Sequence, residues 1–237
     1  MASHIKKWER AVTRTFLATI MVFVIIALIG CGDDDWYYDD CYECWHPTVG
    51  TMILSDPEFD GDISRDSGTG SYTIAQGNTQ RVYVGIDPAT GAESRAFMDF
   101  PLRNIDGIPV NASIVSATID MVINNIVPQP LVGTIPIRID LVSFQPPTLV
   151  GTDFDRTLQP ALATTTITPP ISQADFGNHI VVDVTSLLIE AQRLGLANFQ
   201  IRILRELGPV SPGLIEINDT TGVNRMVLAP LLQVTYY

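Results

Sequence analysis

Two of the three cysteines stand close together, in the segment Cys41-Tyr42-Glu43-Cys44, and His46 follows two residues later. A zinc site needs about four ligands, and after Cys31 the remaining nitrogen donors of that kind are His46 and His179. A thioredoxin-like redox pair expects a βαβ context, which the surrounding sequence lacks. In an exported protein the plain interpretation is a local disulfide. We favour that disulfide and keep the metal and redox roles as alternatives.

The third cysteine, Cys31, ends a segment with the features of an export signal. Residues 1–14 carry Lys6, Lys7, Arg10 and Arg14 against one acid, and residues 15–30 carry no charge. A basic region, an apolar region and a small residue at the end are typical of a secretory signal peptide.

The end of this segment, Leu28-Ile29-Gly30-Cys31, resembles the lipobox of bacterial lipoproteins. The resemblance implies cleavage after Gly30, a diacylglycerol on the Cys31 thiol and acylation of the new amino group. Two or more acyl chains would hold the protein firmly on a membrane. The alternative is an uncleaved membrane helix, but a span needs about 20 apolar residues and this segment is short for that.

Few residues have types and spacing that would support catalysis or metal binding. A Ser-His-Asp arrangement would have to use His179, for which a surface position is the simpler interpretation. Asp56, Glu58, Asp60 and Gly61 fall on positions of an EF-hand-like calcium loop. The match fails at Glu58 and at Ser67, where a bidentate Glu is needed. We therefore expect no enzyme activity, no metal and no cofactor, and we interpret residues 55–72 as a solvated loop.

Charge and length limit the classes of function. The chain has a formal net charge of −12, and loss of residues 1–30 would remove four basic residues and one acid, which leaves −15. No lysine follows Lys7, so Schiff-base and P-loop lysine chemistry are excluded from the body. Such a surface repels phosphates, and we expect no nucleic-acid partner. The composition predicts three parts: a signal peptide at 1–30, an acidic aromatic tether at 31–50 and a β-sandwich domain at 51–237.

Period-two alternation in the body predicts half-buried β-strands. Apolar residues alternate with polar ones in 94–102, 113–124, 134–144 and 199–204, and shorter strands are expected at 81–84, 180–184, 214–218 and 226–237. Each long strand should give its sheet one dry face and one wet face, so a second layer must cover the dry one. Thr185 or Ser186 can cap a short helix that ends at Gly195. Residues 145–176 lack periodicity, and a loop of that length is often functional.

Five segments, taken in order, carry a family likeness: 95–102 (RAFMDFPL), 114–119 (IVSATI), 182–188 (VDVTSLL), 198–202 (NFQIR) and 232–236 (LQVTY). Together they resemble the DNRLRE-type jelly-roll domains, which are similar to carbohydrate-binding modules. The likeness covers about residues 80–237 and departs from the family in the long 145–176 insertion. It implies an all-β, jelly-roll-like sandwich with one short helix, found in cell-surface and extracellular proteins.

These observations lead to three functional hypotheses. The first is a lipid-anchored binding or adhesion module of the bacterial cell envelope, with polysaccharide as a candidate ligand and Tyr83, Phe97 and Phe144 as candidate platform residues. The second is a structural or accessory subunit that binds an envelope protein, and the third is a hydrolase with an unrecognised site. A lipoprotein of this kind would face the periplasm or the exterior, on the outer membrane if the cell is Gram-negative.

A set of charged residues falls on the outward faces of the expected strands: Arg95, Asp99, Asp120, Arg138 and Asp140. Two interpretations are open for them. They can form part of a sugar-binding platform, or they can form cross-strand ion pairs, which is the interpretation we prefer.

Overall fold

A computed structural model describes residues 47–103, 107–128, 133–145, 147–208 and 211–237. Residues 47–237 form one compact unit, and β1 begins at Val49, inside the segment assigned to the tether. Cys31 and the Cys41–Cys44 pair lie outside the described residues, so lipidation and the disulfide stay predictions. Within the described ranges no helix is long and apolar enough to cross a membrane.

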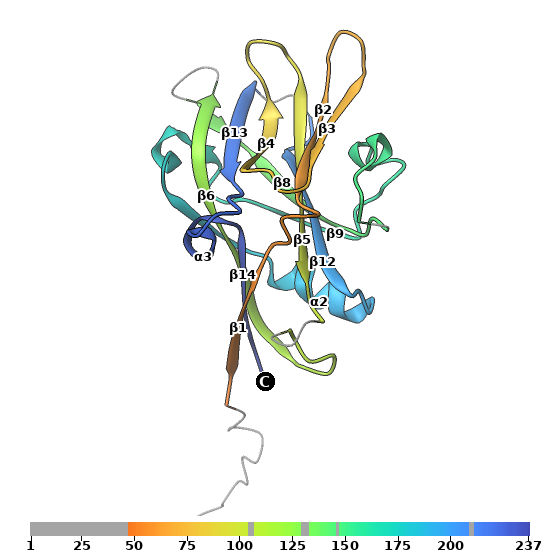
Figure 1. Cartoon of the computed structure of the whole chain (residues 1–237), viewed down its shortest axis with the longest axis vertical. Helices are drawn as coiled ribbons and strands as arrows, with labels where there is room; N and C mark the ends of the chain where they lie inside the picture. The colour runs from red at the N-terminus through yellow and green to blue at the C-terminus, as the bar shows by residue number, and fades with distance from the viewer. Residues whose placement is uncertain (1–46, 104–106, 129–132, 146, 209–210) are drawn as a thin grey trace, which may run out of the picture. The chain divides into compact units, whose positions relative to one another are not determined.

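The fold is an all-β sandwich whose strand pairs are all antiparallel, as the alternation predicted (Figure 1). One layer, sheet A, has the order β1 (Val49–Leu54), β14 (Leu231–Tyr236), β6 (Ile114–Pro128) and β11 (His179–Asp183). The other, sheet B, contains β13 (Gly213–Asn218), β4 (Arg81–Ile86), β5 (Glu93–Pro101), β12 (Asn198–Arg205), β8 (Ile137–Val142) and β9 (Ala163–Thr166). A hairpin of β2 (Gly61–Arg65) and β3 (Tyr72–Gln76) pairs with β5.

The long strand β6 belongs to both layers. Its first part pairs with β14 and β11, and its last part pairs with β13. The register shifts opposite Glu216 and Ile217 of β13, and a bulge of this kind bends the strand. One continuous strand therefore passes from one sheet of the sandwich to the other.

The main core fills the space between the sheets. It contains the apolar residues of alternating positions, such as Met98 of β5, Ile119 of β6 and Ile201 of β12. The helix α2 (Thr185–Arg193) adds Leu187, Leu188 and Ala191 to this core. These strands follow the period-two prediction because the main core takes every second residue.

The predicted helix is present, but its capping differs from the prediction. The Asp183 carboxylate accepts hydrogen bonds from the Thr185 backbone N–H at 2.8 Å and the Thr185 hydroxyl at 2.6 Å. Asp183 thus satisfies an N–H at the start of the helix, where the sequence suggested Thr185 or Ser186. At the other end Gly195 has φ of 69°, a left-handed conformation that ends helices and favours glycine.

Three segments differ from the predictions. Residues 55–72 are not wholly a solvated loop, because β2 lies within them and Asp60, Gly61 and Asp62 are buried. The 145–176 segment contains β9 and the short strand β10 (Ile171–Ser172), which pairs with β7 (Thr134–Ile135). Residues 225–228 form the helical turn α3 (Arg225–Leu228) before the last strand.

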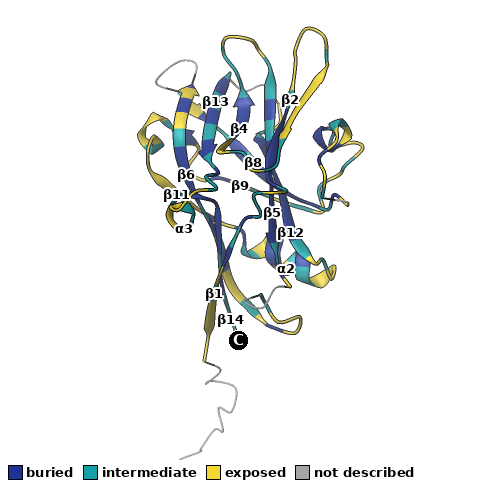
Figure 2. Ribbon diagram, viewed as in Figure 1, coloured by how far each residue is buried: buried dark blue, intermediate teal, exposed yellow. Residues whose placement is uncertain are grey.

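Both faces of β5 and β12 are buried, which corrects the expectation of a wet outer face. On β12 the outward residues Gln200, Arg202 and Leu204 are at most 1% exposed. Figure 2 shows both strands dark over most of their length. The cause is the segment after β8, which carries the 3-10 turn η1 (Gly151–Phe154). It packs Phe144, Leu149 and Phe154 against Ile63, Phe97 and Val142 in a second apolar cluster.

Candidate arginine site on the outer face of sheet B

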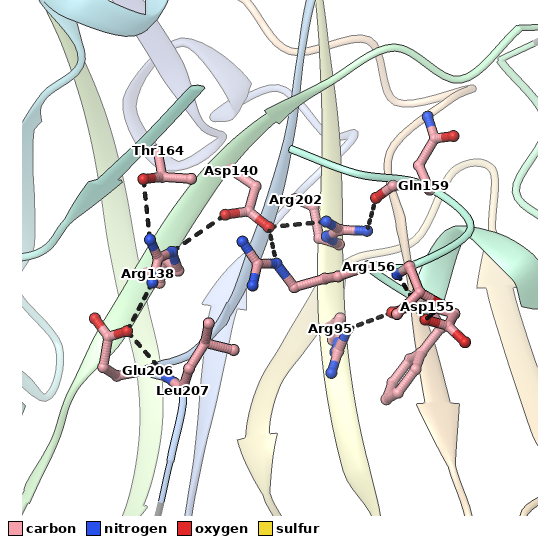
Figure 3. Close-up of polar contacts among 12 residues, drawn as sticks. Arg95, Arg138, Asp140, Asp155, Arg156, Gln159, Thr164, Arg202, Glu206 and Leu207 are labelled. Carbon is pink, nitrogen blue, oxygen red and sulfur yellow. Dashed lines mark hydrogen bonds and ion pairs between the residues drawn. The ribbon is translucent and has the colours of Figure 1, made fainter. Parts of the chain in front are cut away.

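Three arginines converge on one carboxylate on the outer face of sheet B. Asp140 of β8 receives Arg202 Nη2 of β12 at 2.8 Å, Arg156 Nε at 2.9 Å and Arg138 Nε at 3.3 Å (Figure 3). We call Arg138, Arg156 and Arg202 with Asp140 the arginine cluster. Its formal charge is +2, and it falls to +1 when Glu206, which pairs with Arg138, is included.

The strands explain why these side chains meet. Arg202 and Asp140 are directly opposite each other in the β12–β8 register, and Arg138 lies two residues before Asp140, so all three point to the same face. Arg156 comes from the loop after η1. The cluster therefore combines a rigid sheet with a residue that no strand pattern predicts.

Arg202 is fully buried and holds the covering segment in place. Its Nη1 donates to the backbone oxygens of Asp153 at 2.8 Å and Gln159 at 3.1 Å, and Figure 3 includes the second of these bonds. Burial lowers the pKa of Arg202, the Asp140 carboxylate opposes this shift, and the charges of Arg95 and Arg156 lower the pKa further. Arg95 and Arg156 therefore lie close enough to Arg202 to repel its charge.

Arg138 and Arg156 reach the surface. The Arg138 side chain is 21% exposed and also donates to Glu206 Oε1 at 2.9 Å and Thr164 Oγ1 at 3.0 Å. Arg156 is 26% exposed and bonds Asp140 through Nε. Within the described part of the chain, no other polar contact engages its two terminal nitrogens. These nitrogens are held in place and remain available to an acceptor from solvent.

A pair of aromatic side chains adjoins the arginine cluster at Phe154, two residues before Arg156. The Arg95 guanidinium lies over the Phe154 ring, 3.9 Å from its centroid, a cation–π arrangement. Tyr72 of β3 packs against Phe154 with ring centroids 5.4 Å apart and is 42% exposed. Tyr72 thus places an exposed aromatic ring beside the basic surface.

A groove lies next to these residues in the covering segment. Its lining mixes hydroxyl and amide side chains with two apolar residues and one carboxylate: Ser143, Phe144, Gln145, Thr148, Val150, Thr152, Asp153 and Gln159. Gln159 belongs to both the groove and the Arg202 contacts. The covering segment therefore supplies both the groove and the backbone oxygens that hold Arg202.

The three candidate platform residues do not form a platform. Phe97 is fully buried and Phe144 is 3% exposed, and their rings pack edge to face at 5.9 Å in the second cluster. Tyr83 lies elsewhere, on β4, with the Arg81 guanidinium 5.9 Å from its ring centroid. Burial raises the pKa of the Tyr83 hydroxyl, and the Glu216 carboxylate raises it further. The hydrophobic segment after β8 covers Phe97 and Phe144, so they cannot meet a ligand.

The charged outward residues divide into two groups. Asp140 pairs across strands with Arg202 of β12, as the cross-strand alternative predicted. The Arg138–Asp140 and Arg95–Glu93 pairs instead join residues two apart on one strand. Asp99 is buried, accepts two bonds from Asn198 Nδ2 and has its pKa raised by burial. Asp120 lies on sheet A, where its Oδ1 is 2.8 Å from His179 Nδ1.

Sequence reasoning missed Arg156, Arg202 and Tyr72 as members of one surface. Arg202 looked like an ordinary outward residue of an alternating strand, and Arg156 lies in a segment without periodicity. The one available signal was the excess of arginine over lysine beyond residue 7, since arginine favours bidentate contacts with carboxylates.

Comparison with known proteins adds no family to this description. No protein-family model matches the chain, and no curated protein matches it. The DNRLRE-type resemblance therefore remains a prediction from the quoted segments.

Proposed function

We propose that the chain is a lipid-anchored binding module of the bacterial cell envelope that recognises an anionic polysaccharide through the arginine cluster. The observation that carries this proposal is the convergence of three guanidinium groups on the single carboxylate of Asp140. The terminal nitrogens of Arg156 would attract a uronate or sulfate group, and planar guanidinium groups bind such oxyanions bidentately.

The neighbouring side chains support a sugar polymer over a small anion. Tyr72 offers an exposed ring on which a sugar face can pack, since its body is apolar and its hydroxyl can bond. The adjoining groove supplies the hydroxyl groups of Ser143, Thr148 and Thr152 for hydrogen bonds to sugar hydroxyls. An extended ligand would lie along this groove and reach Arg156.

The lipid anchor in this proposal rests on the Leu28–Cys31 segment. The acids that follow Cys31 are expected to stay solvated, because like charges repel, and we interpret them as the tether between the anchor and the sandwich.

A panel of polysaccharides tests the proposal. The full chain in mild detergent is screened by biolayer interferometry against polyuronates, sulfated glycans, peptidoglycan and neutral glucans of matched length. We expect saturable binding to anionic polymers that weakens with added salt. Arg156→Gln should weaken binding at least about tenfold, while the control Arg193→Gln on α2 should not change it. Equal binding to neutral and anionic polymers, or none to any, would refute the proposal.

A protein partner is the second candidate, supported by a groove between the edges of the two sheets. Thr165, Thr166 and Ile167 line one side of it and Val181, Asp183 and Ile189 the other. Val181 is 63% exposed and Ile189 is 45% exposed. If no glycan binds, crosslinking from residues at this groove in the native envelope becomes the next experiment.

A further inference from the structure

A second cluster of polar side chains is buried away from the arginine cluster, at the ends of β1 and β13 and the start of β2. Ser55 follows β1, Asp60 precedes β2 and Asp219 follows β13. Asp60 and Asp219 are fully buried and Ser55 is 1% exposed. The strand order therefore brings together residues that lie far apart in the sequence.

Each carboxylate has one oxygen that is held and one that is not. Asp60 Oδ1 accepts the Asp99 backbone N–H at 2.8 Å, and Asp219 Oδ2 accepts the Thr79 hydroxyl at 2.7 Å. Asp60 Oδ2, Asp219 Oδ1 and Ser55 Oγ are buried and have no hydrogen-bond partner among the described residues. Buried polar atoms of this kind are costly and call for an explanation.

The three unpartnered oxygens belong to side chains that interact with one another. Burial, followed by the charge of Asp219, raises the pKa of Asp60 well above its ordinary value, and Ser55 lies close enough to oppose that shift. Burial also raises the pKa of Asp219 to about 6, and the Thr79 hydroxyl, a side-chain polar contact with Asp60 and the charge of Arg225 oppose this shift. The cluster thus brings together the buried oxygens of two carboxyl groups and one hydroxyl group.

Arg225 does not neutralise this charge by direct pairing. Its Nη2 donates to the Ser55 backbone oxygen, and its Nε is buried without a partner in the described residues. In the same part of the chain, no ion pair joins Arg225 to Asp60 or Asp219. Two buried carboxylates without a paired cation would have to take up protons or bind a cation.

We propose that a divalent cation of the calcium type binds between Asp60 and Asp219, with Ser55 Oγ as a third oxygen ligand. All three donors are oxygens, which suits a hard cation and not zinc or copper. Calcium takes six to eight oxygens. No group of three or more His, Cys, Asp or Glu side chains that could hold a metal occurs in the described ranges, so backbone carbonyls and water complete the shell.

The surroundings give the cation a path and a role. A polar groove lined by Ser55, Asp56, Pro57 and Arg225 adjoins the cluster. A cation there would link the β1–β2 connection to Asp219, the residue after β13, and so stabilise the packing of these two segments. With two carboxylates the site belongs with the weak extracellular calcium modules, whose dissociation constants are about 10⁻⁴–10⁻³ M.

Thermal unfolding with and without calcium tests this site. The full chain in detergent is stripped with EDTA at pH 7.5, dialysed, and heated in 0 to about 10 mM CaCl₂. We expect calcium to raise Tm by about 3–8 °C, because it binds the folded state alone. Equilibrium dialysis should show calcium bound at a site that Asp219→Asn removes. The same variant should also lose the calcium-dependent rise in Tm. The acids of the tether can bind calcium too, but without an effect on Tm.

Matched variants make the result specific. Asp62→Asn alters another buried aspartate whose oxygens are not among the unpartnered atoms, and it should keep the calcium shift. If Asp219→Asn fails to fold, Ser55→Ala should fold and reduce the shift. A Tm that calcium leaves unchanged, together with a Tm that rises on acidification through pH 6, would overturn the proposal and assign a shared proton to Asp60 and Asp219.

Discussion

The outer faces of the two sheets differ although their strands have the same alternation. On sheet A the outward residues of β11 stay exposed: His179, Val181 and Asp183. On sheet B the outward residues Asp140, Gln200 and Arg202 are almost fully buried. The difference comes from one segment, 143–162, which covers sheet B and leaves sheet A open. Alternation therefore predicts which residues share a face, but another part of the chain decides whether that face is wet.

Covering a sheet face also changes how much an ion pair on that face contributes to stability. On sheet A the Asp120–His179 pair is partly solvated, with side chains 21% and 47% exposed, and such pairs contribute little to stability. On sheet B the Asp140–Arg202 pair is fully buried, so each charge depends on the other. A carboxylate paired with a basic side chain therefore contributes little on the open sheet and much on the covered one.

The largest effect should come from breaking the buried pair. Asp140→Ala leaves Arg202 charged and buried without its carboxylate, and should lower the free energy of unfolding by about 3–5 kcal/mol. Urea denaturation measures this loss. Replacing both residues with apolar ones, as in Asp140→Leu with Arg202→Met, should recover much of it. A loss below about 1 kcal/mol for Asp140→Ala would show that water reaches the pair.

The next effect should come from the covering segment itself. Phe154→Ala removes a ring that is 2% exposed in the second apolar cluster and should cost about 3 kcal/mol. Limited proteolysis should then cut preferentially within 145–162, because the segment loses its main apolar anchor. Cleavage elsewhere with that segment intact would mean that the hydrogen bonds of Arg202 suffice to hold it.

Asp62 is a buried carboxylate without an arginine partner among the described residues, and replacing it should raise the free energy of unfolding instead of lowering it. Burial raises the pKa of Asp62 to about 6, so the folded chain retains a proton between about pH 4 and 6 that the unfolded chain has released. The stability that this proton gives is present at low pH and is lost as pH rises through 6. Asp62→Asn should therefore raise the free energy of unfolding at pH 7.5 by about 1–2 kcal/mol. Urea denaturation of wild type and Asp62→Asn at pH 4.5 and 7.5, both in EDTA, measures this gain. If the two proteins show the same change in the free energy of unfolding between the two pH values, the raised pKa of Asp62 is contradicted.

The smallest effect should come from sheet A. His179→Ala removes the partner of Asp120 on an open face and should change the free energy of unfolding by at most about 0.5 kcal/mol. The same urea titrations provide the comparison with Asp140→Ala. A large loss here would mean that sheet A is also covered in the intact protein, for example by a partner.

The sequence predicted the class and most strands, because the main core takes every second residue of β5, β6, β8 and β12. It did not predict β9, since the Thr164–Thr166 run is polar throughout and lacks alternation. Nor did it reveal the Asp60–Asp219 pair, because a local calcium-loop motif cannot include a carboxylate from the far end of the chain. The alternation predicted part of the arginine cluster, because Arg138 and Asp140 share a strand face. It could not predict Arg156, whose position depends on how a segment without periodicity folds over the sheet.

The most direct test of the arginine cluster as a binding surface is hydrogen–deuterium exchange with and without an anionic polysaccharide. The full chain in detergent is compared in the absence and presence of a saturating polyuronate chosen from the screen. Our account predicts slower exchange in 151–162 and in the Tyr72 hairpin, with sheet A unchanged. Slower exchange confined to β11 and β6 of sheet A would contradict it and would move the binding surface to the open face.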